Sequence, residues 1–284
     1  MDKLVRYDNK LVEAVYCFDL LEKKLMVFIS LLYQNNPNSL EITTSLSQIE
    51  KEGISTVNSY REIKKALKSI INKSITIDYF NPKNPNKPDY DIFTILTSVK
   101  YKDGIIKLKI NENIKPYLIE LAEKYTTYHI ENIKPLASAY SIRIYELLKM
   151  QEGIERRQKA IEYTITVEEL RTMLGITTEY ERYYDFKRKV LEQAKKDLKE
   201  KTDLKFSYKE EKLGRSVHKL TFKIAENAEE KEKRKAKKAE EKHLKEKEKL
   251  RAAHQAALEA SQLNLFAPEE VKEEALKELE KRGY

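Results

Sequence analysis

The sequence predicts an α+β fold in which one order of elements occurs twice. In each copy a strand ending in Ile-Thr leads into a short helix closed by glycine, and a helix with a basic face and a β-rich stretch follow. The copies span residues 42–67 and 165–191, with equivalent tyrosines at Tyr60 and Tyr184. Two helices followed by a hairpin are typical of the winged helix-turn-helix, whose second helix enters a DNA major groove. The repeat therefore predicts two winged-helix domains in tandem.

Length and charge agree with this interpretation. The chain has 284 residues, which leaves room for two domains with cores of their own. Lys and Arg together number 55 against 47 Asp and Glu, which gives a net charge of +8. A basic excess favours a polyanionic partner such as nucleic acid.

Membrane insertion and secretion are not expected. The longest apolar run, Leu25–Leu32, is much shorter than the roughly 20 residues that a membrane span requires, and no signal peptide opens the chain. Cys17 is the single cysteine, so an internal disulfide is impossible. It lies within a helical apolar pattern, so we expect it to be buried in a core. A chain with one cysteine and no internal disulfide fits a reducing compartment, so we expect the protein to be cytoplasmic.

The elements of the first copy follow from periodicity and turn signals. Apolar residues at helical spacing predict one long helix over Leu11–Tyr33. Three strands are expected after the basic helix, and Asp103-Gly104 is a strong hairpin signal between the last two. These strands are Ile75–Tyr79, Ile92–Val99 and Ile105–Ile110.

The second copy begins after a segment with Pro135 and small residues, where an amphipathic helix over Tyr140–Met150 starts. Thr166 with Glu169 and Thr178 with Glu181 have the spacing of capping boxes at helix starts. Strands over Leu204–Tyr208 and Val217–Ile224 flank a turn at Gly214-Arg215. We therefore assign residues 1–134 to the first domain, 135–226 to the second and 227–284 to a charged tail, which is either a helix or a disordered tether.

In both copies the helix that follows the glycine has separate apolar and basic faces. A helical wheel places Tyr60, Ile63, Ala66, Leu67, Ile70 and Ile71 on the inner face of the first helix, and Tyr183, Phe186, Val190, Ala194 and Leu198 on that of the second. A buried apolar face with a basic face outside is what a groove-binding helix requires, although an ordinary lysine-rich surface helix has the same pattern. The repeat favours DNA binding.

The candidate DNA contacts are the outward-facing residues of these helices and the tip of the second hairpin. In the first copy they are Arg61, Lys64, Lys65 and Lys68, and in the second Arg182, Tyr184, Lys187, Arg188, Lys189, Lys195, Lys212 and Arg215. Arginine can bind guanine O6 and N7 with two hydrogen bonds, whereas lysine acts mainly as a point charge on phosphate. Lys187 falls nearer the apolar side of the wheel. Solvated surfaces are the alternative interpretation for the hairpin tip.

Three segments of the chain resemble parts of the replication initiators of iteron plasmids. They are the helix Ser138–Leu148, the run Tyr184–Leu191 and the turn Lys212–Arg215, and the resemblance covers about residues 5–225. In that family two winged-helix domains stand in tandem, a monomer binds repeated origin sites, and a dimer represses the initiator's own promoter. The resemblance implies that Arg182, Lys187, Arg188 and Lys189 read bases and hold phosphates. It also implies a monomer–dimer equilibrium, and the host helicase and host initiator as partners.

The tail carries a second resemblance. The run Gln262-Leu263-Asn264-Leu265-Phe266 is similar to the peptide with which bacterial replication proteins dock into the sliding clamp. Gln262, Leu263, Leu265 and Phe266 would be its contact residues. Packing of Leu265 and Phe266 against the chain's own helices is the alternative.

Catalysis, cofactors and metals are not expected. The sequence has no phosphate-binding loop of the ATPase type, its four histidines are scattered, and one cysteine cannot make a cysteine-based zinc site. We therefore predict a plasmid replication initiator that is not an enzyme and binds double-stranded origin DNA. Two alternatives stay open: a nicking initiator that cuts DNA through one of the 18 tyrosines, and a plain transcriptional repressor.

Overall fold

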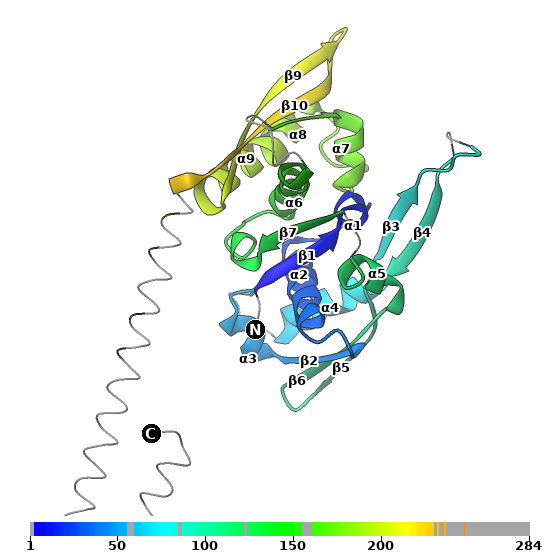
Figure 1. Ribbon diagram of the computed structural model, residues 1–284, viewed down its shortest axis with the longest axis vertical. Coiled ribbons are helices and arrows are strands. Elements are labelled where there is room, and N and C mark those ends of the chain that lie inside the picture. The colour runs from blue at the N-terminus through cyan, green and yellow to red at the C-terminus, as the bar shows by residue number, and fades with distance from the viewer. Residues whose placement is uncertain are drawn as a thin grey trace, which may run out of the picture. The chain divides into compact units, whose positions relative to one another are not determined.

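Figure 1 shows the computed structural model of the chain. The structure describes residues 3–55, 60–84, 87–121, 124–154 and 161–229, and the single positions 232, 236, 243 and 247. Residues 1–228 form one compact unit and residues 229–284 a second. Within the described ranges, none of the helices combines the length and the apolar character needed to cross a bilayer.

Two antiparallel three-stranded sheets share one strand order. Their strands are β2 (Glu41–Ser45), β5 (Leu96–Lys102) and β6 (Ile105–Ile110) in the first domain, and β8 (Ile161–Thr166), β9 (Leu204–Leu213) and β10 (Ser216–Glu226) in the second. In each sheet the last strand in the chain lies between the other two, giving the orders β2-β6-β5 and β8-β10-β9. The repeated sequence pattern thus corresponds to a repeated topology.

The helices also follow one order in the two domains. They are α2 (Leu20–Asn35), α3 (Leu46–Lys51) and α4 (Tyr60–Asn72) in the first, and α6 (Ala139–Ile154), α7 (Val167–Met173), α8 (Tyr183–Phe186) and α9 (Glu192–Lys201) in the second. A π-helical turn over Lys187–Leu191 joins α8 to α9, so residues 183–201 form one helix. We call α4 the first recognition helix and residues 183–201 the second. The expected pair of winged-helix domains is present.

The first domain has additional elements. The strands β1 (Leu4–Asp8) and β7 (Tyr125–His129) pair with each other, and the short helices α1 (Asn9–Glu13) and α5 (Lys115–Leu118) lie beside them. A hairpin of β3 (Ser74–Tyr79) and β4 (Asp89–Thr94) is inserted between α4 and β5 and projects from the domain in Figure 1. In the second domain only residues 202 and 203 separate α9 from β9, so no such hairpin is inserted there.

The single helix predicted over Leu11–Tyr33 is wrong. Asp19 opens α2 with a capping box, in which its carboxylate accepts from the Glu22 amide at 2.9 Å and the Glu22 carboxylate accepts from the Asp19 amide at 2.7 Å. Between α1 and α2, Val15 exchanges two backbone hydrogen bonds with Thr76 of β3, at 2.9 and 3.0 Å. Apolar residues on both sides of this break face the same core, so the helical pattern continues across it.

The break also changes the environment of Cys17. We expected a buried residue, but Cys17 is exposed because it lies in the extended segment before α2 rather than on a helix face. Its Cβ lies close to Gly175 of the second domain, so this segment runs along the junction between the domains.

The strand predicted over Ile92–Val99 is also divided. β4 and β5 belong to different sheets, and the chain bends at Ile95, a fully buried residue whose carbonyl accepts from the Asn111 amide at 2.9 Å. Each half finds its own partner strand, which the uninterrupted apolar run does not reveal.

Helix α6 is buried on nearly all sides, so the prediction that it is amphipathic is wrong. Every residue over 141–148 is buried, including charged Arg143 and Glu146. Arg143 Nη2 donates to the carbonyl of Ala14 at 2.8 Å and to that of Met173 in α7 at 3.1 Å. One side chain therefore contacts the segment after α1 and the second domain.

The buried charge of Glu146 is matched from the first domain. Its carboxylate lies 2.9 Å from Lys23 Nζ of α2 and accepts from the Tyr128 hydroxyl at 2.6 Å. Burial lowers the pKa of Lys23 to about 8, although Glu146 acts in the opposite direction. Removing one partner of a buried pair leaves an uncompensated charge, so α6 holds the domains together through contacts that do not tolerate truncation.

Candidate nucleic-acid interface

The first recognition helix separates its side chains as predicted. Ile63, Ala66, Leu67 and Ile70 are buried, whereas Arg61, Lys64, Lys65 and Lys68 are exposed. Among the described residues, none of these four basic side chains has an ion-pair partner. The face is therefore an uncompensated row of positive charge.

Tyr60 does not belong to the inner face as expected. Its side chain is 43% exposed, and its ring centroid lies 4.9 Å from that of Tyr101 in β5. Lys64 Nζ lies 5.4 Å from the Tyr60 ring centroid. Side chains at a helix start point back past the first turn, so Tyr60 reaches the neighbouring hairpin instead of the core. The start of α4 and the β5–β6 hairpin thus form one surface.

The β5–β6 hairpin is the wing of the first domain, and the predicted DNA contacts do not include it. Its turn residues Asp103 and Gly104 have φ values of 50° and 80°, as in a type I′ turn, and the hairpin predicted there is present. Exposed Lys100 and Lys107 are directly opposite in the ladder, and exposed Lys102 stands at the tip. Like charges opposite each other are unfavourable without a partner. The internal repeat carried the missing signal, because both hairpins follow a recognition helix.

The apolar and basic side chains of the second recognition helix also lie on the faces predicted for them. Phe186, Val190, Ala194 and Leu198 are buried, and Tyr183 is half-buried. Arg182, Tyr184, Arg188, Lys189 and Lys196 are exposed, whereas Lys187 and Lys195 are half-buried. The π-helical turn spans three of the basic positions and buries both Val190 and Leu191. Such turns add a residue to one turn of helix and occur frequently at functional sites.

Carboxylates lie beside the basic residues of the second recognition helix. Glu210 of β9 accepts from Lys187 Nζ at 2.8 Å and from the Tyr183 hydroxyl at 2.9 Å. Burial alone would raise the pKa of Glu210, but these hydrogen bonds bring it below its ordinary value. Lys187 therefore turns toward β9, in agreement with its place near the apolar side of the wheel.

Arg188 and Lys195 have acidic neighbours on their own helix. Arg188 Nη2 lies 3.5 Å from Asp185 Oδ1, and its guanidinium carbon lies 5.8 Å from the Tyr184 ring centroid. Lys195 Nζ lies 3.9 Å from Glu192 Oε2. Side chains so placed are partly ordered before any ligand arrives, which reduces the entropy lost on binding.

The wing of the second domain is the long β9–β10 hairpin. It turns at Gly214, whose φ of +65° is a left-handed conformation that glycine adopts without strain. Lys212 and Arg215 are exposed on either side of this turn. The predicted wing tip is therefore presented as expected, at the end of the hairpin in Figure 1.

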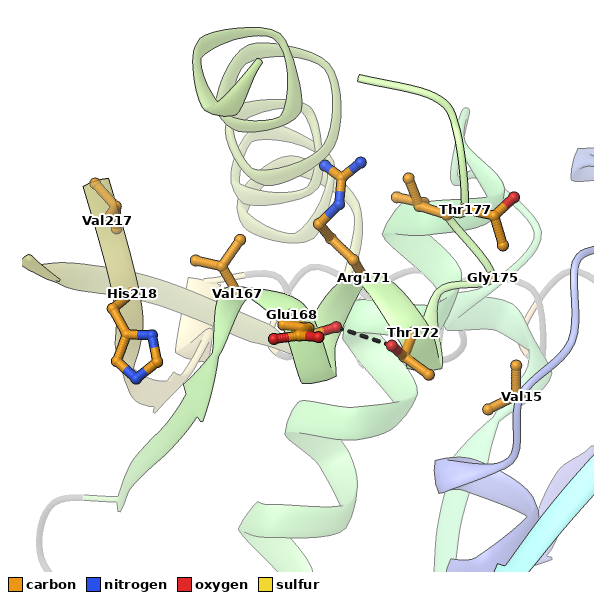
Figure 2. A pocket seen from close by; sticks show the side chains of 10 residues that line it. Val15, Val167, Glu168, Arg171, Thr172, Gly175, Thr177, Val217 and His218 are labelled. Atoms are coloured by element: carbon orange, nitrogen blue, oxygen red, sulfur yellow. Dashed lines mark hydrogen bonds between the residues drawn. The ribbon is translucent and has the colours of Figure 1, made fainter. Parts of the chain in front are cut away.

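A cavity of about 560 Å³ lies between α7, the start of β10 and the segment after α1 (Figure 2). Val15 lines it from the first domain, and Arg171, Gly175, Thr177 and His218 line it from the second. An added Cβ on Gly175 would meet the Tyr16 carbonyl oxygen at 2.7 Å, so the two segments are in close contact. The cavity lies beside the turn that leads into the second recognition helix.

No group of three or more potential metal ligands occurs in the part of the chain that the structure describes. The peptide Gln262–Phe266, with its predicted clamp contacts, lies outside the described residues.

Comparison with known proteins identifies both halves of this arrangement. The model for the first winged-helix domain of initiator replication proteins matches residues 4–149, and that for the second matches residues 166–224. A replication initiation protein of Escherichia coli is 27% identical over 219 residues, which are 74% of this chain and 66% of that protein. The PI protein of Escherichia coli is 28% identical over 161 residues, or 51% of this chain and 52% of that one.

Among solved structures, the crystal structure of the Pi initiator protein in complex with iteron DNA has the same fold. The TM-score is 0.57 at 22% identity, over 79% of this chain and 98% of the other. The alignments with the two curated relatives cover about two thirds and about half of their lengths.

Proposed function

Because this chain belongs to the family of plasmid replication initiators with two winged-helix domains, we propose that it starts replication by binding repeated double-stranded sites at its plasmid origin. Both recognition helices and both wings would take part. The proposal assigns residues 1–134 to the first DNA-binding domain and 135–226 to the second, which would supply most of the sequence specificity. It places the protein in the cytoplasm.

The observation that carries this proposal is the repeated pairing of a basic helix with a basic wing. In the first domain the exposed residues of α4 lie beside a wing with Lys100, Lys102 and Lys107. In the second, Arg188 accompanies a wing tipped by Lys212 and Arg215. A helix in the major groove with a wing on the adjacent backbone or minor groove uses both surfaces on one duplex. The Pi initiator protein has the same fold and was crystallised with iteron DNA.

Footprinting on the DNA that flanks the gene tests this proposal. We expect protected sites that repeat at a constant spacing, because each protomer would cover one copy of a short sequence. A scrambled duplex of the same length and composition is the control. Equal binding to both duplexes at physiological salt would contradict sequence-specific initiation.

We propose that origin opening proceeds without a catalytic step by this protein. Protomers bound side by side would strain the adjacent DNA, and the host initiator and helicase would then act there. Incubation with supercoiled origin DNA and Mg²⁺ tests the point. Relaxation of the plasmid, with a covalent bond between DNA and a tyrosine, would instead support the nicking alternative.

We also propose that the tail peptide Gln262–Phe266 binds the host sliding clamp. Leu265 and Phe266 would enter an apolar pocket, Gln262 would set the direction of the peptide, and Leu263 would add an apolar contact. A peptide of this size is expected to bind with a micromolar constant, about −8 kcal/mol, and tethering at an origin would raise its effective concentration.

Replacing Leu265 and Phe266 by alanine tests clamp binding. The double variant should bind origin DNA like the wild type but lose the clamp in a pull-down and support a lower plasmid copy number. Replacing Asn264 by alanine is a matched control within the same peptide. Unchanged clamp retention by the double variant would favour packing of these side chains on the chain's own helices.

We further propose that two copies pair through the first domain and that this dimer represses the initiator's own promoter. The inserted β3–β4 hairpin supports this idea, because Phe80, Tyr90 and Ile92 are 76%, 64% and 58% exposed. Exposed apolar groups on a short hairpin are typical of an interface. Ile92→Asp should shift the protein to monomer in sedimentation equilibrium, whereas an exposed polar control, Lys87→Asp, should not. A monomeric wild type at high micromolar concentration would refute the pairing.

A further inference from the structure

The second recognition helix begins without a side-chain cap. Arg182 occupies the cap position, and its side chain makes no capping hydrogen bond. The Arg182 carbonyl accepts from the amides of Asp185 and Phe186 at 3.0 and 3.2 Å. The predicted capping pair Thr178 and Glu181 does not start a helix, so that prediction is wrong. The cap residue's own side chain therefore does not fix the start of this helix.

The turn before the helix contains a residue in an unfavourable conformation. Tyr180 has a φ of 54°, in the left-handed region that a bulky side chain rarely adopts. Such a conformation persists only where the surroundings hold it, and these residues tend to occur at functional sites. The turn is thus a point where the position of the recognition helix is determined.

Arg171 of α7 holds this turn with a two-pronged contact. Its Nη1 donates to the carbonyl of Tyr180 at 2.9 Å, and its Nη2 donates to that of Glu179 at 2.6 Å. Its guanidinium carbon lies 5.3 Å from the ring centroid of buried Phe186, within the first turn of the helix. The planar guanidinium matches two adjacent carbonyls in a way that lysine cannot. Figure 2 shows Arg171 rising from α7 beside the segment that carries Thr177.

Helix α6 supports the same turn from the other side. The Tyr140 hydroxyl donates to Glu179 Oε2 at 3.0 Å, and the rings of Tyr140 and Tyr180 meet edge to face at 6.1 Å. The turn is therefore held between Arg171 of α7 and Tyr140 of α6. Since α6 also contacts the first domain, the start of the recognition helix is tied to the domain junction.

We propose that Arg171 is a positioning residue for sequence-specific DNA recognition. By fixing the left-handed turn at Tyr180, it sets where the second recognition helix begins, and so where Arg182, Tyr184 and Arg188 stand relative to the groove. This proposal rests on the proposed function, because it assumes that this helix reads bases. Arg171 itself would touch no base.

Loss of the Arg171 contact with the Tyr180 turn should reduce sequence-specific DNA binding more than binding to DNA of any sequence. Hydrogen bonds to base edges require placement to within about 0.5 Å, whereas contacts between flexible lysines and phosphates tolerate displacement. A loosened turn would therefore reduce affinity for the origin site and leave affinity for a scrambled duplex nearly unchanged.

The test compares Arg171→Gln with Lys205→Gln, which removes an equal charge from an exposed position of β9. We expect Arg171→Gln to weaken origin binding about tenfold, the equivalent of one lost base contact, with the scrambled duplex unaffected. Lys205→Gln should change both affinities little. Arg171→Lys keeps the charge but not the fork, so it should fail to restore specificity. An equal fall on both duplexes, or full rescue by lysine, would show a phosphate contact instead.

A measurement without DNA separates this proposal from the proposed function. In the free protein, the amides of Asp185 and Phe186 should exchange with solvent faster in Arg171→Gln than in the wild type, while core amides of β10 stay protected. Unchanged exchange at both amides would overturn the positioning role of Arg171, even if the wild type binds its origin. If the wild type does not prefer the origin duplex over the scrambled duplex, the proposed function is overturned, but the role of Arg171 in holding the turn is not. If Arg171→Gln does not fold, Arg171→Lys provides the same exchange test.

Discussion

The two winged helices share a strand order but hold their positive charges differently. In the first domain, Arg61, Lys64, Lys65 and Lys68 have no carboxylate partner within the described residues. In the second, Lys187 pairs with Glu210, while Arg188 and Lys195 lie near carboxylates of their own helix. The first recognition helix exposes basic side chains that are unpaired within the described residues, whereas the second holds three of its basic side chains beside carboxylates.

This difference suggests a division of labour on DNA. Free lysines attract phosphates of any sequence and lose rotamer entropy on contact. A basic side chain beside a carboxylate is ordered in advance, and the carboxylate repels phosphates that arrive in the wrong place. We therefore expect the first domain to supply affinity and the second to supply discrimination.

The largest expected effect tests whether the two domains can be compared as parts of one folding unit. Glu146→Ala leaves Lys23 buried without its partner, so we expect a loss of about 3–5 kcal/mol in the free energy of unfolding. Both domains should unfold in a single transition when followed by circular dichroism in urea. Glu162→Ala, which breaks an exposed pair with Lys223, should leave the free energy of unfolding almost unchanged. Two separate transitions would show that the domains are independent.

The next effect concerns discrimination by the second domain. Arg188→Ala should weaken binding to the origin site by about 1–3 kcal/mol, because its outward guanidinium can read guanine. The melting temperature should change little, since the side chain is exposed. Titrations with origin and scrambled duplexes provide the measurement. Unchanged origin affinity, or a collapse of the melting temperature, would contradict the assignment.

A smaller effect on origin binding is expected from the first domain. Replacing Lys64, Lys65 and Lys68 together by alanine should weaken binding to every sequence and lower the slope of log K against log salt by roughly one per lost phosphate contact. Replacing Lys205, Lys209 and Lys223 removes the same charge from exposed positions of β9 and β10. If only this control triple lowers the slope, the basic face of α4 does not meet DNA.

The smallest expected effect concerns the ion pair between Glu210 and Lys187, which is one of the differences between the two recognition helices. Glu210→Gln frees Lys187, so binding to scrambled DNA should increase while origin binding changes by under about 1 kcal/mol. The pKa of Glu210 lies below its ordinary value, so the ion pair is present above the pH at which a free glutamic acid titrates and is lost as the pH falls through the lowered pKa. The ratio of the two dissociation constants at neutral pH is the measurement. A ratio equal to that of the wild type would show that the pair does not contribute to discrimination.

Much of the fold and of the candidate interface could be predicted from the sequence because the signals are local. The hairpin turns at Asp103-Gly104 and Gly214 depend on residues that accept left-handed φ values, and the capping box joins Thr166 to Glu169, only three positions later. The apolar and basic faces of both recognition helices follow from helical periodicity. The repeat of these signals identified two winged helices.

The tertiary structure alone decided the features that depend on distant partners. The chain leaves its helix at Val15 because Thr76, 61 residues away, offers two backbone hydrogen bonds. The helical wheel places Lys187 near the apolar side, but its ion-pair partner Glu210 lies on the following strand and is known only from the structure. Arg171 donates to the carbonyls of Glu179 and Tyr180, and no sequence pattern near Arg171 predicts this contact. Periodicity records which side of an element is apolar, but it does not record which segment will cover that side or which polar groups will meet there, because those contacts form only when the chain closes on itself.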